Sequence, residues 1–165
     1  MPLPNPSVAQ AFATSSVSFA LRDLRPDPTA VGVYQDGGWV VRTTDNVGQY
    51  CSERLGEILV RAGARFMSQP SAAIAAELVD YQVVEGGTFA GTVHLRVIVH
   101  RGAGEPWSQT YVGTSTRWGR THNPENFNEA LSNALADAAQ KLLKDDAFAT
   151  ALIGPVGPIG STQPR

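Results

Sequence analysis

The sequence has few of the residues that mark redox, metal or cofactor sites. Cys51 is the single cysteine among 165 residues, so a disulfide within the chain is excluded. His94 and His100 fall in one predicted strand, roughly 20 Å apart at ~3.3 Å per residue, whereas a metal–ligand bond is ~2 Å long. No stretch matches GxxxxGK[ST], or GxGxxG before a helix, so no phosphate-binding loop is indicated. We therefore expect no metal and no cofactor.

Charge is also scarce. Charged residues make up 17% of the chain and the net charge is −2, without a cluster of Lys or Arg, so the chain is not expected to bind nucleic acid. No apolar run approaches the ~18 residues that span a bilayer. The start of the chain, 1–6, lacks a basic segment followed by an apolar one and is not a signal peptide as it stands.

The centre of the chain predicts three consecutive strands between Ile74 and Thr116. Val93, Leu95, Val97 and Val99 alternate with polar or exposed positions, which indicates a strand with one buried face. The turns fall at 85–87 and 101–106, where glycines gather. Shorter strands are predicted at 16–22, 39–42 and 64–67, and residues 26–38 are predicted to form a loop.

Two segments show the 3.6-residue spacing of amphipathic helices. The first begins at Val47 and ends at Gly63, and the second begins with Asn123 as N-cap and Pro124 at the first helical position. A short further helix is predicted from Asp145 to Leu152. The apolar faces of the two long helices carry Val47, Cys51, Leu55, Ile58, Leu59, Ala62, Phe127, Leu131, Ala134, Leu135, Ala138 and Leu142.

These elements predict an α+β domain. We expect an antiparallel-rich sheet of four or five strands, with two main helices packed on one face. The domain is predicted to cover residues 16–152, between a flexible, proline-rich tether at 1–15 and a flexible tail at 153–165. Cys51 falls on an apolar helix face, so we expect it to be a core residue rather than a nucleophile.

Five residues are candidates for binding a partner or a ligand. Asp23 and Arg25, two residues apart at a strand end, can pair with each other, cap a loop or hold a partner. Tyr34, Trp39 and Trp118 do not fall on a predicted core face, and exposed aromatic side chains in loops can anchor an interface. The alternative, which the sequence favours for each of them, is that these aromatic residues cover local sheet edges.

The order of elements resembles a known family, the YajG-type lipoproteins of Gram-negative bacteria. The resemblance covers about residues 16–152. It rests on 23–26 (DLRP), 31–33 (VGV), 62–63 (AG), 75–78 (AAEL) and a last helix with Ala130, Leu131, Ala134, Leu135 and Ala138, closing on 142–145 (LLKD). The resemblance implies a domain at the periplasmic face of the outer membrane, tethered through an N-terminal lipidated cysteine. The present chain has no cysteine near its start, so this location requires that a signal and anchor segment has been removed; otherwise a cytoplasmic location is expected.

The function hypotheses follow from the resemblance and from the missing catalytic chemistry. The first is a non-catalytic cell-envelope module that binds a protein partner or itself, through a sheet edge or the loop aromatic residues. The second is a small-ligand carrier with a pocket under the 26–42 loop. The third is an enzyme, which would need a cluster such as His94 with Glu77 or Asp80. We expect a non-enzyme, with contact to a membrane only through such an anchor.

Overall fold

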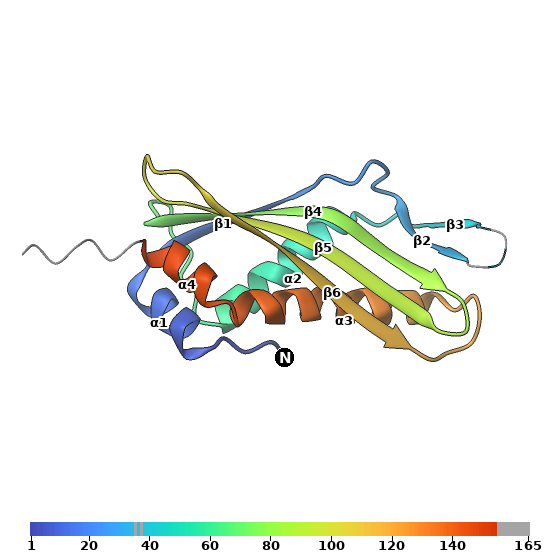
Figure 1. Ribbon diagram of the computed structural model, residues 1–165. Coiled ribbons are helices and arrows are strands. Elements are labelled where there is room, and N and C mark those ends of the chain that lie inside the picture. Colours follow the sequence, from blue (N-terminus) through green and yellow to red (C-terminus); the bar gives the residue numbers. More distant parts are fainter. Residues whose placement is uncertain (35, 37, 155–165) are drawn as a thin grey trace, which may run out of the picture.

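The computed structural model describes residues 1–34, 36 and 38–154, which form a mixed sheet of six strands with helices packed against it (Figure 1). The elements in chain order are α1 (Pro6–Thr14), β1 (Val17–Asp23), β2 (Ala30–Tyr34), β3 (Val40–Arg42), α2 (Val47–Arg61), β4 (Ala72–Glu85), β5 (Phe89–His100), β6 (Trp107–Arg117), α3 (Pro124–Leu143) and α4 (Asp146–Ile153). The predicted α+β class and the two main helices are confirmed. The predicted number of strands was too low.

The long strands β4, β5 and β6 form the predicted antiparallel meander. Two short strands share the outer edge of β4 and run parallel to it: β1 pairs with residues 72–78, and β2 pairs with residues 83–85. β3 then pairs with β2 and ends the sheet. A bulge after Leu78 leaves Val79 unpaired, so Asp80 lies opposite His94.

β2 is the strand that sequence reasoning missed, because Gly32 was interpreted as a loop glycine. A Cβ atom at Gly32 would lie 2.4 Å from the carbonyl oxygen of Val83 and 3.0 Å from the ring of Phe127. The glycine therefore allows a close approach of β2 to β4 and α3. The predicted strand at 64–67 is reduced to one bridge between Val17 and Phe66.

The predicted flexible tether at 1–15 is wrong, because it contains the helix α1. Asn5 caps this helix by accepting a hydrogen bond from the backbone N–H of Val8 at 2.8 Å, and Pro6 follows as the first helical residue. Val8 and Phe12 are buried in the core. The Asn5 side chain also donates to the carbonyl oxygen of Lys144, the C-cap of α3, and to the carboxylate of Asp146, which ties α1 to the end of α3 and the start of α4.

The core divides into two clusters along the sheet, and the residues predicted for it on α2, α3 and β5 are buried. The first cluster lies at the end that carries α1 and α4, hereafter the helical end. The second lies toward the hairpin end, defined by the β2–β3 hairpin, the β4–β5 turn and residues 118–123 (Figure 1). Cys51 is fully buried in the second cluster, as predicted.

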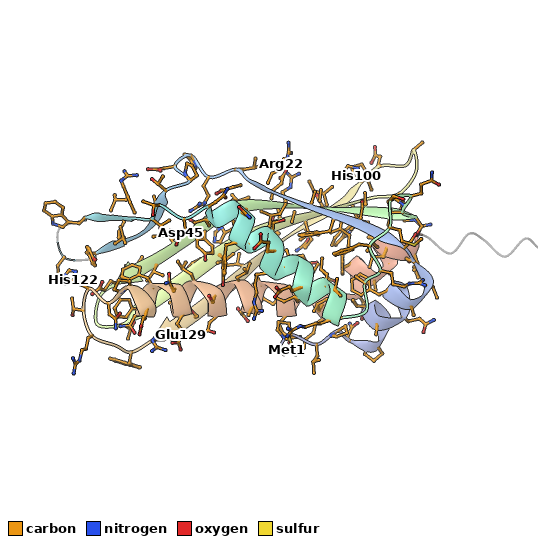
Figure 2. All side chains as sticks on the ribbon, turned by 180° about the vertical axis from the view of Figure 1, so that it is seen from behind. Met1, Arg22, Asp45, His100, His122 and Glu129 are labelled. Atoms are coloured by element: carbon orange, nitrogen blue, oxygen red, sulfur yellow. The ribbon has the colours of Figure 1, made fainter. Side chains whose placement is uncertain are left out.

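α2 and α3 pack on the same face of the sheet (Figure 2). Within the described part of the chain, no helix is long and apolar enough to cross a membrane. The predicted tail at 153–165 lies outside the described residues from residue 155 onward, and Ile153 is still the last residue of α4.

Candidate functional site

Asp23 and Arg25 form an internal pair where β1 ends. Arg25 Nε donates to Asp23 Oδ1 at 2.9 Å, and Nη2 donates to Asp23 Oδ2 at 2.7 Å. The same guanidinium donates to the carbonyl oxygens of Pro28 and Ala30, and it lies 5.5 Å from the centre of the Tyr81 ring. Burial raises the pKa of Asp23, but the hydrogen bonds and charge of Arg25 outweigh it and lower the pKa overall.

This pair therefore shapes the turn between β1 and β2. Arg25 is only 8% exposed, and its guanidinium nitrogens already donate to Asp23 and to two carbonyl groups. A partner would have to break these bonds to use them. The sequence left three roles open for Asp23 and Arg25. In the structure they pair with each other, and Arg25 holds the loop that follows.

The three candidate aromatic residues belong to segments of the hairpin end: Tyr34 ends β2, Trp39 precedes β3, and Trp118 follows β6. The ring of Tyr34 lies 4.4 Å from that of His122 and 6.0 Å from that of Phe127, so the end of β2 contacts the loop before α3. Trp39 follows Tyr34 in the chain and Trp118 precedes His122, so both lie close in sequence to this contact. Their side chains are 73% and 78% exposed. Folding alone therefore leaves these two large apolar side chains in water.

A buried carboxylate fixes the loop that carries Trp118. Glu85 is 5% exposed, and its Oε1 accepts a hydrogen bond from the backbone N–H of His122 at 3.0 Å. His122 has a φ of 60°, which is uncommon for a residue other than glycine. On the other side of the loop, Asn126 Nδ2 donates to the carbonyl oxygen of Arg120 at 3.0 Å. Trp118 is thus held on an anchored loop.

Sequence reasoning missed Glu85 and Asn126. Glu85 was placed in a hairpin turn, and Asn126 was not singled out. A signal for Glu85 was present, because it continues the alternating buried positions Tyr81 and Val83 of β4. Its Oε2 is the one buried side-chain oxygen or nitrogen without a hydrogen-bond partner among the described residues.

A cleft of about 440 Å³ separates the first turns of α2 from α3. Its floor consists of the buried residues Val31, Val47, Tyr81 and Leu131. Tyr50 bridges the two helices, because its hydroxyl lies 2.8 Å from that of Ser132. The remaining lining side chains are polar: Thr43, Asp45, Asn46, Gln49, Glu53 and Asn128. The volume is within the range of ligand pockets, about 300–1,000 Å³.

This cleft only partly matches the predicted pocket under the 26–42 loop. Val31 and, just beyond the loop, Thr43 contribute to the lining, but Tyr34 and Trp39 do not. A second cleft, of about 680 Å³, lies between the β5–β6 turn and α4, next to Trp107. Arg101 lines it, but its guanidinium already donates to the carbonyl oxygen of Leu152.

One edge of the sheet, β6, is protected by α3. Asp137 accepts the outward N–H of Thr114 at 2.9 Å, and Lys141 donates to the outward carbonyl oxygen of Val112 at 2.7 Å. Asp137 and Lys141 also form an ion pair at 2.8 Å. Protein side chains therefore occupy the backbone groups that an added strand would need at the middle of β6.

The uncovered face of the sheet carries the residues considered for an enzyme. Glu77 is held between Arg22 and Arg96, with both ion pairs at 3.2 Å (Arg22 in Figure 2). His94 lies opposite Asp80, but no hydrogen bond joins their side chains. His100 and His122 lie at opposite ends of the molecule (Figure 2). Among the described residues, no three His, Cys, Asp or Glu side chains come close enough to hold a metal.

The comparisons with known proteins support the fold. No protein-family model and no curated protein matches the sequence. A Xanthomonas campestris protein described under the family model DUF330 is similar over 93% of this chain and 91% of its own, with a TM-score of 0.65 and 15% identity. A candidate lipoprotein from Caulobacter crescentus is similar over 90% and 97%, with a TM-score of 0.53 and 15% identity. The chain thus has the fold of these bacterial proteins.

Proposed function

We propose that this protein is a non-catalytic interaction module of the bacterial cell envelope, which binds a protein partner or a second copy of itself through the hairpin end. The observation that carries the proposal is the pair Trp39 and Trp118, both about three-quarters exposed on segments that meet through Tyr34 and His122. Tryptophan is enriched among the residues that dominate binding energy at interfaces. The proposal does not include catalysis, because the indole side chains that carry it are hydrogen-bond donors only and supply no general acid or base.

Two observations support the envelope part of the proposal. The fold is similar to that of a candidate lipoprotein, and the sequence resembles the YajG-type lipoproteins over about residues 16–152. The finer assignment to the YajG type, and a location at the periplasmic face of the outer membrane, belong to this proposal. Cell fractionation and the intact mass of the N-terminus of the native gene product test this part separately from the binding surface.

Photo-crosslinking in the native host tests the binding surface. A photoreactive phenylalanine analogue replaces Trp39 in one strain and Trp118 in another, and the control strain carries it at Phe66. Phe66 is also an exposed aromatic residue, but it contacts the start of β1, toward the helical end. We expect adducts from positions 39 and 118 and none from position 66. Adducts from position 66 alone would place the interface elsewhere.

The cleft between α2 and α3 favours a second candidate function, a small-ligand carrier. The supporting observation is the apolar floor, which includes Tyr81 and Leu131, beneath a polar rim. Ligand sites are typically concave and apolar with a few convergent polar groups. A carrier function and a partner-binding function do not compete for the same residues, because Trp39 and Trp118 do not line the cleft.

A further inference from the structure

The cleft between α2 and α3 has an unbalanced charge. Two carboxylates, Asp45 and Glu53, lie on its rim, and no Lys or Arg of the described part of the chain lines it. Glu53 accepts one hydrogen bond, from Gln49 Nε2 at 2.8 Å, which leaves its negative charge uncompensated. The nearby Arg25 does not compensate either carboxylate, because it is paired with Asp23.

The start of α2 contributes a charge of the opposite sign, but a smaller one. A helix N-terminus is equivalent to roughly half a positive elementary charge. Asn46 already accepts the N–H of Gln49 at this terminus, at 2.9 Å. Two full negative charges therefore outweigh the helix, and the potential in the cleft favours a cation over an anion.

The shape and lining of the cleft add a second requirement. Val31, Val47 and Leu131 form an apolar floor, which offers no hydrogen-bond partner to the polar groups of a ligand. Tyr50 and Tyr81 also line the cleft, and their rings can contact a cation or an apolar group. A volume of about 440 Å³ is much larger than a bare metal ion needs.

We infer that the cleft binds an organic cation, a small molecule with an ammonium group and an apolar body. The ammonium group lies at the rim near Asp45 and Glu53, and the apolar body lies on the floor above Leu131. This inference rests on the second candidate function, the carrier, and specifies the chemistry of its ligand.

Three probes with one aromatic body separate the charge from the shape: phenethylamine, 2-phenylethanol and phenylacetate. Each is titrated into the whole chain at neutral pH and low salt, and two-dimensional NMR follows the backbone amides of Gln49, Tyr50 and Ser132. We expect the amine to bind about fivefold more tightly than the alcohol, with the carboxylate weakest, from the attraction of partly exposed charges. The advantage of the amine should shrink in high salt.

Matched variants locate the effect. Glu53→Gln and Asp45→Asn keep the side-chain shape and should each reduce the affinity for the amine about two- to fivefold, with no change for the alcohol. Glu57→Gln is the control, because Glu57 lies on the same helix, pairs with Arg54 and does not line the cleft. Thermal melts confirm that the variants are folded.

The possible outcomes test the organic-cation inference separately from the carrier function on which it rests. Equal binding of the amine and the alcohol, with shifts at the cleft, would overturn the organic cation and leave the carrier function standing. Shifts elsewhere on the molecule, or no binding by any of the three probes, would overturn both. Preferential binding of the amine that Glu53→Gln weakens and Glu57→Gln does not would support both.

Discussion

The two ends of this molecule treat their polar and aromatic groups differently. At the helical end, most of the groups that we describe are satisfied within the chain: Asn5 caps α1 and donates to Lys144, Tyr111 donates to Asp145 at 2.6 Å, and Phe12 packs edge-on against Phe148. At the hairpin end, Trp39 and Trp118 are in water, and Glu85 keeps one oxygen without a partner among the described residues.

This difference separates stability from binding. The contacts of the helical end bury apolar rings and pair polar groups, which is what folding requires. Trp39 and Trp118 bury little of their surface, so they contribute little to folding, and the proposed binding role would account for their exposure. The account therefore predicts large stability effects at the helical end and small ones among the exposed residues of the hairpin end.

Phe148→Ala at the helical end should have the largest effect. The ring is fully buried between Phe12 and Trp107, with ring centres 6.1 Å from each. Its removal leaves a cavity, and we expect the free energy of unfolding to fall by about 3–5 kcal/mol. Urea denaturation measures the change. A loss below ~1 kcal/mol would mean that Phe148 is not packed in the core of the helical end.

Cys51, in the second core cluster, should make stability depend on alkaline pH. Burial raises the pKa of its thiol to about 12, from a reference value of 9.0. The stability that this shift provides is complete below pH 9 and is lost as the pH rises toward 12, because only the unfolded chain ionises easily in that window. Relative to Cys51→Ala, each pH unit in the window should cost about 1.4 kcal/mol.

Urea denaturation of both proteins at pH 8.5 and pH 10.5 measures this slope. Burial also raises the pKa of Tyr81 and of Tyr111. The effect of Tyr111 cancels in the difference, and so does the burial of Tyr81, whereas the contact of Tyr81 with Cys51 is lost in the variant. Parallel stability profiles for the two proteins would show that Cys51 is accessible to water, and would remove it from the core.

Asn5→Ala tests whether α1 belongs to the folded domain. The variant removes the N-cap of α1 and the side-chain bond to Lys144, and we expect a loss of about 1 kcal/mol, within a usual range of about 0.5–2 kcal/mol. Thermal melts measure it, with Ser7→Ala as a control, because Ser7 is an exposed residue of the same helix. No loss in Asn5→Ala would restore the mobile tether that the sequence suggests.

The double variant Trp39→Ala, Trp118→Ala should have the smallest effect on stability. Both side chains are largely exposed, so the change in the free energy of unfolding should stay below about 0.5 kcal/mol. Urea denaturation tests this expectation. A larger loss would mean that the tryptophans pack on the hairpin end and are structural.

The sequence predicted the parts of this fold whose signals are local. The spacing of Leu131, Leu135 and Leu142 and the alternation from Val93 to Val99 identified α3 and β5, because each pattern reports one buried face. α1 was missed although Asn5-Pro6 is the same capping signal as Asn123-Pro124. Its three buried residues, Val8, Ala11 and Phe12, are too few to stand out beside the neighbouring prolines.

The site was less predictable, because it depends on contacts between distant segments. Trp39 and Trp118 were identified as unplaced aromatic residues, but that they share one end follows from Tyr34 meeting His122, which no local pattern encodes. Asp23 and Arg25 looked available in sequence, and only the carbonyl groups of Pro28 and Ala30 show how Arg25 is used. The cleft joins residues from α2, α3, β2 and β4 and has no signature in any one of them.

The most direct test of the central claim is the size of the complex that this protein forms in its native host. Extracts from strains that carry the wild type, the tryptophan double variant or Met67→Ala are compared by native gel electrophoresis. Met67 is an exposed apolar residue, 55% accessible, next to Phe66 and outside the hairpin end. We predict that the wild type and Met67→Ala migrate in a complex, and that the double variant migrates as the isolated chain. A double variant that keeps the full complex would contradict the account.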